Sequence, residues 1–174
     1  MRKQDSAWLV PLVGTTALLM GSDEHSMARE KSNASAISRS NHISDGGLVG
    51  LAALPAGMYL WGSLQGYPKA RETGLLSGEA LVNSLIVNEA LKVVFSRERP
   101  TLTDGQGRFF GRLGDSSFPS THATLSWTAA SVIAHEYPGP LTQALVYGTA
   151  ATVSIARVTG RQHFPSDVVV GSAL

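Results

Sequence analysis

Three side chains with complementary chemistry lie within eleven residues near the end of the chain: the cation Arg157, the imidazole His163 and the carboxylate Asp167. Pro165 suits the start of a helix and Ser166 is a good N-cap, so a helix is predicted here with Asp167 in its first turn. His163 then lies on the incoming loop, where the carboxylate can accept its Nδ1 proton and leave Nε2 free to attack an electrophile. Arg157 can hold that electrophile if it is an anion.

Two further cations lie upstream: Lys92 and, after six intervening residues, Arg99, which Pro100 follows. Apolar residues recur with helical spacing over residues 79–97, and Pro100 disfavours helical geometry at Arg99, so a helix is predicted to end near there. At 1.5 Å per residue the two charges lie roughly 10 Å apart along the axis. They can therefore converge on one anion only from opposite sides or through the helix end.

A polar group opens the next predicted helix, which runs from residue 121 to about residue 135. Ser120 is a natural N-cap, Thr121 follows it, and His122 lies in the first turn. The free N–H groups of that turn and the helix dipole form an anion site, and the imidazole lies beside it. The segment therefore predicts a place where an anion and a proton donor meet.

Each of these groups has a simpler structural explanation when it is taken alone. A lysine or arginine near a helix end packs its stem on apolar surface or binds the last carbonyls, and a serine caps a helix. A histidine in a first turn faces solvent, and a His–Asp pair forms a structural hydrogen bond. Short motifs match by accident often enough that the simpler explanation is preferred for any single one. We prefer the functional interpretation for the three together, in this order and at these spacings.

The elements that must position these residues are all predicted to be helical, because no segment shows the alternation of a strand. The predicted fold is all-α, a single domain of residues 1–174 with about five to six helices and a motif core at residues 79–174. The helices are predicted at residues 7–20, 46–68 with a kink at Pro55, 79–97, 121–135, 141–157 and from 165 onward. Residues 22–45, 69–78 and 101–118 are predicted to be connections, with His25 and His42 as solvated loop residues.

Composition excludes some functions and leaves others open. A formal charge of +1, with no basic stripe among aromatics, gives no reason to expect a nucleic-acid partner. The absence of cysteine excludes disulfides and thiolate metal sites. Uncharged runs at residues 6–22, 46–68 and 137–156 approach the roughly 20 residues that span a bilayer, although their Gly, Ser, Thr and Pro content weakens the signal. Membrane association is therefore possible on the sequence alone.

The three motifs resemble the signature of the type 2 phosphatidic acid phosphatase superfamily, which includes bacterial acid phosphatases, lipid phosphatases and vanadium haloperoxidases. The resemblance covers residues 92–167 and implies that the last helix continues past Leu174. It also implies a bacterial-type cell envelope location, either extracytoplasmic or at a membrane. The motifs that carry it are Lys92-x6-Arg99-Pro100, Pro119-Ser120-Thr121-His122 and Arg157-x5-His163-x3-Asp167. Two positions depart from the family pattern: Thr121 replaces a glycine, and Ala156 replaces a serine.

The resemblance implies a metal-independent hydrolysis of phosphate esters through a phosphohistidine. His163 would be the nucleophile, Asp167 would hold and stabilise its ring, and His122 would protonate the leaving oxygen and later activate water. No cofactor or metal is implied, and the substrate would be a lipid phosphate or a soluble phosphorylated small molecule. The residues implied to bind phosphate are Lys92, Arg99, Ser120, Thr121 and Arg157.

Two alternatives belong to other functional classes. A vanadium haloperoxidase would use the same anion pocket for a vanadate cofactor, but the short chain favours a phosphatase. A non-catalytic helical membrane or interaction module would keep the scaffold, yet it would have little reason to retain both histidines and the aspartate. Bromide-dependent peroxidation with added vanadate separates the first alternative from a phosphatase.

Overall fold

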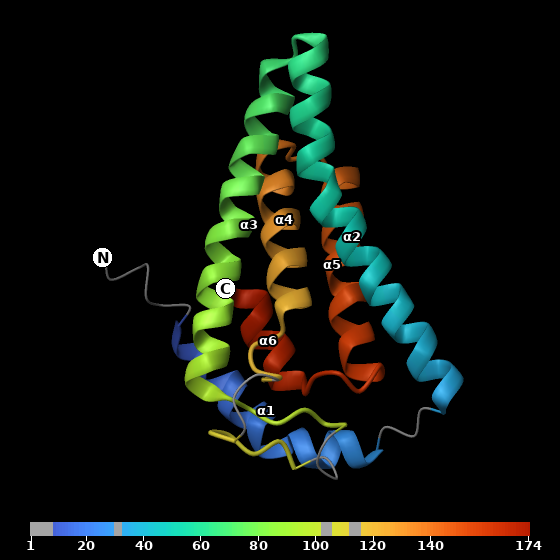
Figure 1. Ribbon diagram of the computed structural model, residues 1–174, viewed down its shortest axis with the longest axis vertical. Coiled ribbons are helices and arrows are strands. Elements are labelled where there is room, and N and C mark those ends of the chain that lie inside the picture. The colour runs from blue at the N-terminus through green and yellow to red at the C-terminus, as the bar shows by residue number, and fades with distance from the viewer. Residues whose placement is uncertain (1–8, 30–32, 102–105, 112–115) are drawn as a thin grey trace.

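The computed structural model describes residues 9–29, 33–101, 106–111 and 116–174. These residues form six helices and no strand, so the all-α prediction and the helix number are confirmed (Figure 1). The helices are α1 (Leu9–Arg29), α2 (Ala34–Gln65), α3 (Pro68–Phe95), α4 (Thr121–Glu136), α5 (Pro140–Thr159) and α6 (Pro165–Ala173).

Two long helices form the frame of the molecule. The antiparallel pair α2 and α3 extends upward beyond α4 and α5, which pack against its lower part, while α1 crosses the lower end and packs on the short α6 (Figure 1). Small residues allow this close packing, and the core lies between α2, α4 and α5. The buried residues of the core are Leu51, Ala129, Ala130, Ile133, Ala134, Val146 and Ala150.

Glycines bring the backbones of α2 and α3 into contact. A Cβ atom added to Gly62 would lie 2.4 Å from the backbone nitrogen of Arg71, and one added to Gly74 would lie 2.5 Å from the carbonyl oxygen of Pro55. The turn between the helices is short because Gly66 caps α2 with a φ of +69°, a value that suits glycine. The two helices therefore form a tight hairpin.

The boundaries of the first three helices differ from the prediction. Most of residues 22–45 is helical, because α1 runs to Arg29 and the Asn33 side chain caps the start of α2 by accepting the Ala36 N–H at 2.9 Å. Residues 69–78 belong to α3. A helix accommodates polar and charged residues well when one of its faces packs against the protein. The polar composition of these segments was therefore no sufficient reason to predict connections. The His25 and His42 side chains are exposed as expected, but on helices and not on loops.

The helices that carry the motifs agree better with the sequence. Helices α4 and α5 match their predicted ranges within two residues, and Ser120 caps α4 as predicted. Helix α3 ends at Phe95, earlier than residue 97. The predicted cap of α6 is wrong: Phe164 occupies the N-cap position and Ser166 lies inside the first turn. The Asp167 carboxylate instead accepts the Phe164 N–H at 2.9 Å, which explains how the helix begins without a polar cap residue.

Candidate active site

The three motifs meet at the lower end of the bundle, where α3 and α5 end and α4 and α6 begin (Figure 1). Backbone hydrogen bonds join them. The Ser120 N–H donates to the Asp167 carbonyl at 3.0 Å, and the Ser117 N–H donates to the Arg97 carbonyl at 2.7 Å. Three segments that are distant in sequence, around Arg97, Ser117–Ser120 and Asp167, are therefore held in one place by main-chain contacts.

His163 is buried, and its hydrogen bond fixes which nitrogen carries the proton. Its Nδ1 lies 2.7 Å from the Ser117 carbonyl oxygen. Because a carbonyl oxygen can only accept, Nδ1 must donate, and the Nε2 lone pair is left free. The predicted direct bond to Asp167 is not formed, since Nδ1 and Oδ2 are 3.7 Å apart. The carboxylate is close enough to attract positive charge on the ring, but the Ser117 carbonyl orients it.

The surroundings keep the His163 ring neutral. Burial lowers the pKa of His163 to about 4, and the cations Arg99 and Arg157 lower it further, while Asp167 acts in the opposite direction. Burial alone would raise the pKa of Asp167, but its attraction to His163 and Arg97 outweighs burial and lowers this pKa. At neutral pH the site therefore pairs a neutral imidazole with an ionised carboxylate.

The Arg157 side chain on α5 is buried, and one of its N–H donors has no partner within the described residues. Its Nη1 donates to the Ser44 hydroxyl at 3.2 Å and to the Asp45 carboxylate at 3.4 Å. Its Nε is buried and has no hydrogen-bond partner among the described residues. Burial lowers the pKa of Arg157 to about 10, so the side chain stays cationic at neutral pH. A buried donor without a partner is costly, and an anion in the site would satisfy it.

His122 faces the same region from the start of α4. Its Nε2 lies 3.0 Å from Oδ1 of Asp45. Burial and then Arg157 lower the pKa of His122, Asp45 raises it, and Lys92 lowers it. Lys92 and Arg157 both lower the pKa of His122, and Arg99 and Arg157 lower that of His163. The predicted cations and both histidines therefore share one site.

Lys92 and Arg99, the two cations of the first motif, reach the site in one of the two ways that the sequence allowed. Lys92 lies in the last turn of α3, with its Nζ 4.0 Å from the Glu89 carboxylate. Arg99 follows the end of that helix and donates to the Gln162 carbonyl at 3.2 Å, beside His163. The two cations therefore approach the site through the helix end.

The second motif is tied into the fold. The buried Ser120 hydroxyl accepts the Ala123 N–H at 3.5 Å, and the Thr121 hydroxyl donates to Asn88 on α3 at 2.9 Å. The Thr121 proton is used within the protein, whereas Ser120 accepts in this bond and keeps its own proton. The Ser120 hydroxyl and the first-turn N–H groups of α4 are therefore the donors that this motif offers to an anion.

Sequence reasoning missed three charged residues. Asp45 of α2 contacts both His122 and Arg157, and Asp23 of α1 and Arg97 form a buried ion pair with 2.8 Å between Nη2 and Oδ2. Arg97 lies between the two cations of the first motif, so its position was a weak signal. The two aspartates lie far away in sequence, in a stretch predicted to be a connection, and nothing in their spacing pointed to the site.

Comparisons with known proteins match the part of the chain that holds the three motifs. The sequence pattern of the PAP2 superfamily matches residues 73–174. The chain belongs to the PAP2 superfamily. Among solved structures, the crystal structure of the first transmembrane PAP2 type phosphatidylglycerolphosphate phosphatase from Bacillus subtilis is similar, with 21% identity and a TM-score of 0.67 over 94% of this chain and 88% of that one. No curated protein sequence matches the chain.

Membership of the PAP2 superfamily confirms the resemblance that the three motifs carried. The matched residues hold all eight predicted site residues, whereas Asp23 and Asp45 lie on α1 and α2, before the match begins. Within the described ranges, no group of three or more His, Asp or Glu side chains is placed to hold a metal ion. The donors that converge at the lower end are cations and N–H groups, which suit an anion.

Proposed function

We propose that this PAP2 protein is a phosphatase that hydrolyses phosphate esters without a metal, through a phosphohistidine on His163. The superfamily supports phosphatase activity in general. The observation that carries the mechanism is the hydrogen bond from His163 Nδ1 to the Ser117 carbonyl, because it leaves an unprotonated Nε2 on a buried, neutral ring. A neutral imidazole whose Nε2 lone pair is free is a nucleophile.

The first step forms a bond between Nε2 and phosphorus while the bond to the leaving oxygen breaks. Lys92, Arg99 and Arg157 hold the non-bridging oxygens, and the unpaired Arg157 Nε gains an acceptor. His122 gives its proton to the leaving oxygen. A bound phosphate adds negative charge beside His122 and so raises its pKa, which offsets the lowering by burial.

The second step returns the enzyme to its starting state. A water gives a proton to His122 and attacks phosphorus, the bond to Nε2 breaks, and inorganic phosphate leaves. Asp167, held near the ring, stabilises the positive charge that His163 carries as the N-phosphoryl imidazolium. The cations replace a metal as the source of charge for the transition state.

Labelling of the intermediate tests this proposal. With ³²P-labelled dinitrophenyl phosphate, whose leaving group needs no proton, His122→Ala should accumulate label on His163, because hydrolysis of the intermediate lacks its base. The reaction is stopped in alkaline denaturant, since a phosphohistidine is labile in acid, and the label is mapped to a peptide. His163→Ala should carry no label. Label on His122, or turnover with no label in any variant, would show that the assignment is wrong.

We further infer that the substrate is a lipid phosphate at a membrane surface. Of the described residues, one helix, Ala34–Gln65, is long and apolar enough to cross a membrane by length and composition. It carries no formal charge from residue 46 to its end, and large apolar side chains project from it, including Leu60 at 58% and Leu64 at 80% exposure. Exposed apolar surface on this scale is typical of a contact with protein or lipid.

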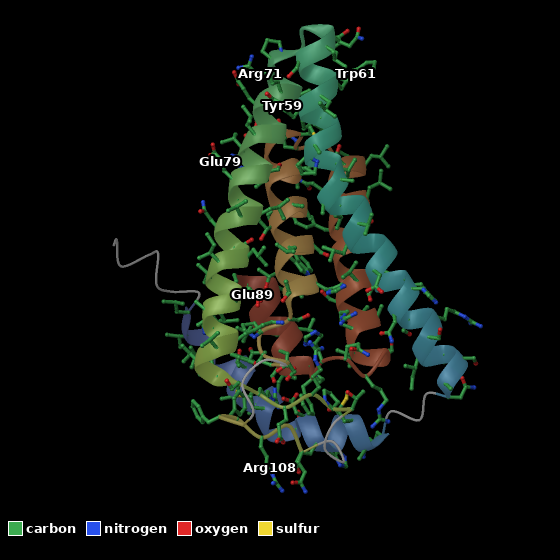
Figure 2. The ribbon with its side chains drawn as sticks, viewed as in Figure 1. Tyr59, Trp61, Arg71, Glu79, Glu89 and Arg108 are labelled. Atoms are coloured by element: carbon green, nitrogen blue, oxygen red, sulfur yellow. The ribbon has the colours of Figure 1, made fainter. Side chains whose placement is uncertain are left out.

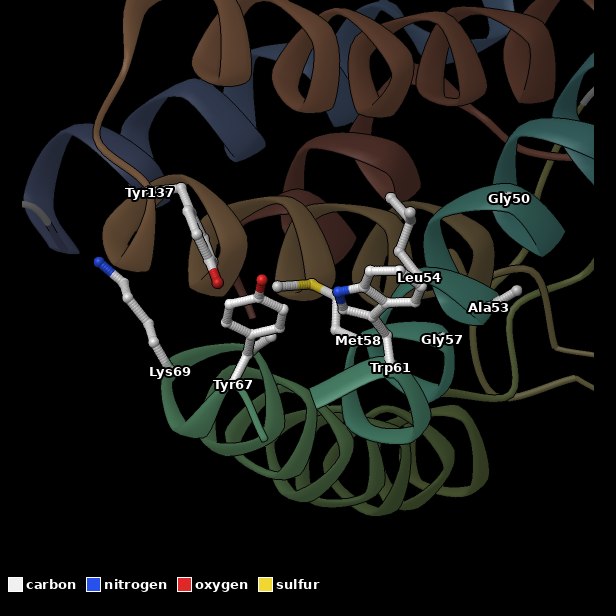
Figure 3. A pocket seen from close by; sticks show the side chains of 10 residues that line it. Gly50, Ala53, Leu54, Gly57, Met58, Trp61, Tyr67, Lys69 and Tyr137 are labelled. Atoms are coloured by element: carbon white, nitrogen blue, oxygen red, sulfur yellow. The ribbon is translucent and has the colours of Figure 1, made fainter. Parts of the chain in front are cut away.

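The side chains at the upper end of the bundle favour lipid over a protein partner as the contact of this exposed surface. A groove of about 730 Å³ lies between α2, the start of α3 and the end of α4, with Trp61, Tyr67 and Tyr137 around it (Figure 3). Lys69 lies 4.8 Å from the ring centroid of Tyr137. Trp61 and Tyr59 project near the tip of the hairpin (Figure 2). Tryptophan, tyrosine and lysine at the end of an uncharged helical segment are typical of a membrane–water interface.

Kinetics at a surface test the substrate class. We expect hydrolysis of a long-chain lipid phosphate in mixed micelles to depend on its surface mole fraction and to exceed hydrolysis of a water-soluble phosphomonoester in kcat/KM. Equal kcat/KM for the two substrates would contradict the lipid assignment and leave the phosphohistidine mechanism intact.

A further inference from the structure

A buried chain of charges extends from His163 to the N-terminal helix. Asp167 Oδ1 accepts from Nη1 of Arg97 at 2.6 Å, and Nη2 of Arg97 donates to Asp23 Oδ2 at 2.8 Å. The three charged side chains are at most 3% exposed. Ser166 joins them, because its hydroxyl accepts from Arg97 at 2.8 Å and donates to Asp23. Such a chain is costly to bury unless every member is paired, and here the charges alternate.

Arg97 is fixed on every side. Its Nε donates to the Gly107 carbonyl at 3.1 Å, and its guanidinium lies 4.6 Å from the ring centroid of Phe109 and 4.0 Å from that of Phe164. Gly107 has a φ of +55°, and a Cβ there would lie 2.4 Å from the Phe164 ring. The loop therefore needs glycine at this position to close over the guanidinium.

Arg97 also holds both groups that face His163 Nδ1. Its side chain binds Asp167, while its backbone carbonyl accepts the Ser117 N–H and its N–H donates to the Ser116 hydroxyl at 3.0 Å. The Ser117 carbonyl is the acceptor of the His163 proton. A displacement of Arg97 would therefore move the hydrogen-bond acceptor and the carboxylate together.

We propose that Asp23 and Arg97 are positioning residues of the phosphoryl-transfer step, and that α1 supplies through Asp23 a part of the site that lies outside the PAP2 match. Arg97 alone would draw Asp167 away from His163 and cancel its charge. Asp23 neutralises Arg97, so that the buried group keeps one net negative charge for the ring that becomes cationic on phosphorylation. The inference rests on the proposed role of His163 as nucleophile.

The test is a double-mutant cycle on the rate of phosphoenzyme formation. Asp23→Asn should slow phosphorylation by about 10- to 100-fold, by analogy with the loss that follows removal of the hydrogen-bond partners of metal ligands. Vanadate, which mimics the transferring phosphoryl group, should still inhibit with a constant within about twofold of wild type, since no anion ligand has changed. The exposed neighbour Glu24 provides the matched control, and Glu24→Gln should change neither quantity.

Non-additivity separates positioning from general destabilisation. If Asp23 acts through Asp167, the double variant Asp23→Asn/Asp167→Asn should be no slower than Asp167→Asn alone. Losses that multiply, or a wild-type rate in folded Asp23→Asn, would overturn the proposal. Should Asp23→Asn fail to fold, Ser166→Ala decides: it removes one contact of both Asp23 and Arg97 but no charge, and it should slow phosphorylation without weakening vanadate.

Two further results complete the test. Arg97→Lys should retain more activity than Arg97→Met, because the charge remains while the fork that spans both carboxylates is lost. Wild type that turns over without label on His163 would refute the phosphohistidine mechanism, whereas wild type with label and an additive cycle would refute only the role of Asp23. The two failures are therefore distinguishable.

Discussion

The two ends of the bundle bury opposite kinds of side chain. At the lower end charged and polar residues are inside, as with Asp23, Arg97 and Asp167, and each has a charged partner. Along the upper hairpin the apolar side chains of Leu60 and Leu64 are exposed, and Trp61 projects outward near the tip (Figure 2). A soluble protein normally hides apolar groups and solvates charges. The lower end is therefore a site whose buried charges are held by ion pairs, and the upper end is the apolar surface that we propose contacts lipid.

Removing the cation of the buried chain should have the largest effect on stability. Arg97→Met leaves Asp23 and Asp167 buried without their partner, and breaking a buried pair in this way costs roughly 3–5 kcal/mol. Chemical denaturation monitored by circular dichroism in detergent measures it. At the opposite end Lys69→Met, on an exposed side chain, should change the unfolding free energy little. Equal losses at both ends would contradict the contrast between them.

Polar substitutions on the exposed face of α2 should weaken binding to lipid. Burying a leucine contributes about 1.5–3 kcal/mol, so Leu60→Gln or Leu64→Gln should each lower the partition coefficient into vesicles by roughly tenfold or more. Vesicle flotation measures it. Ile43→Gln, on the part of α2 near the active site, is the control and should have a smaller effect. Unchanged flotation of both leucine variants would argue that another partner covers this face.

A single methyl group should disturb the hairpin. Gly74→Ala places a Cβ 2.5 Å from the Pro55 carbonyl oxygen, and such overpacking costs about 1–3 kcal/mol. The control is Gly78→Ala, where nothing lies within 4 Å and the change should instead stabilise the helix slightly. Thermal unfolding of the two variants gives the comparison, and Gly74→Ala as stable as wild type would mean that the helices separate easily.

The smallest predicted effect is a shift in the pH dependence of activity. Asp45 raises the pKa of His122, and in the proposed mechanism protonated His122 is the acid of the first step. Asp45→Asn should therefore lower this pKa and move the basic limb of the kcat/KM profile to lower pH, whereas Asp45→Glu should restore the limb. A profile of unchanged shape in Asp45→Asn would exclude His122 as the group that titrates.

The features that could be predicted from the sequence are those set by residues close together along the chain. Ser120 caps α4 as expected, and the residues of the three motifs meet because helix ends place them there. Ser166 was assigned as a cap from its type alone, but the Asp167 carboxylate performs that task for α6. Asp23 and Asp45 were missed, since each contacts the site across more than 70 residues of chain and polar residues in a mixed stretch carry no periodic signal.

The glycine contacts of the hairpin have a consequence for folding in different solvents. In water, helices associate largely because apolar surface leaves the solvent, but lipid tails offer no such drive and association there relies on close van der Waals contact. Gly62 and Gly74 let the backbones of α2 and α3 touch, a contact that works equally in either medium. The pairing of α2 with α3 therefore does not require the apolar surface of the hairpin to be surrounded by water.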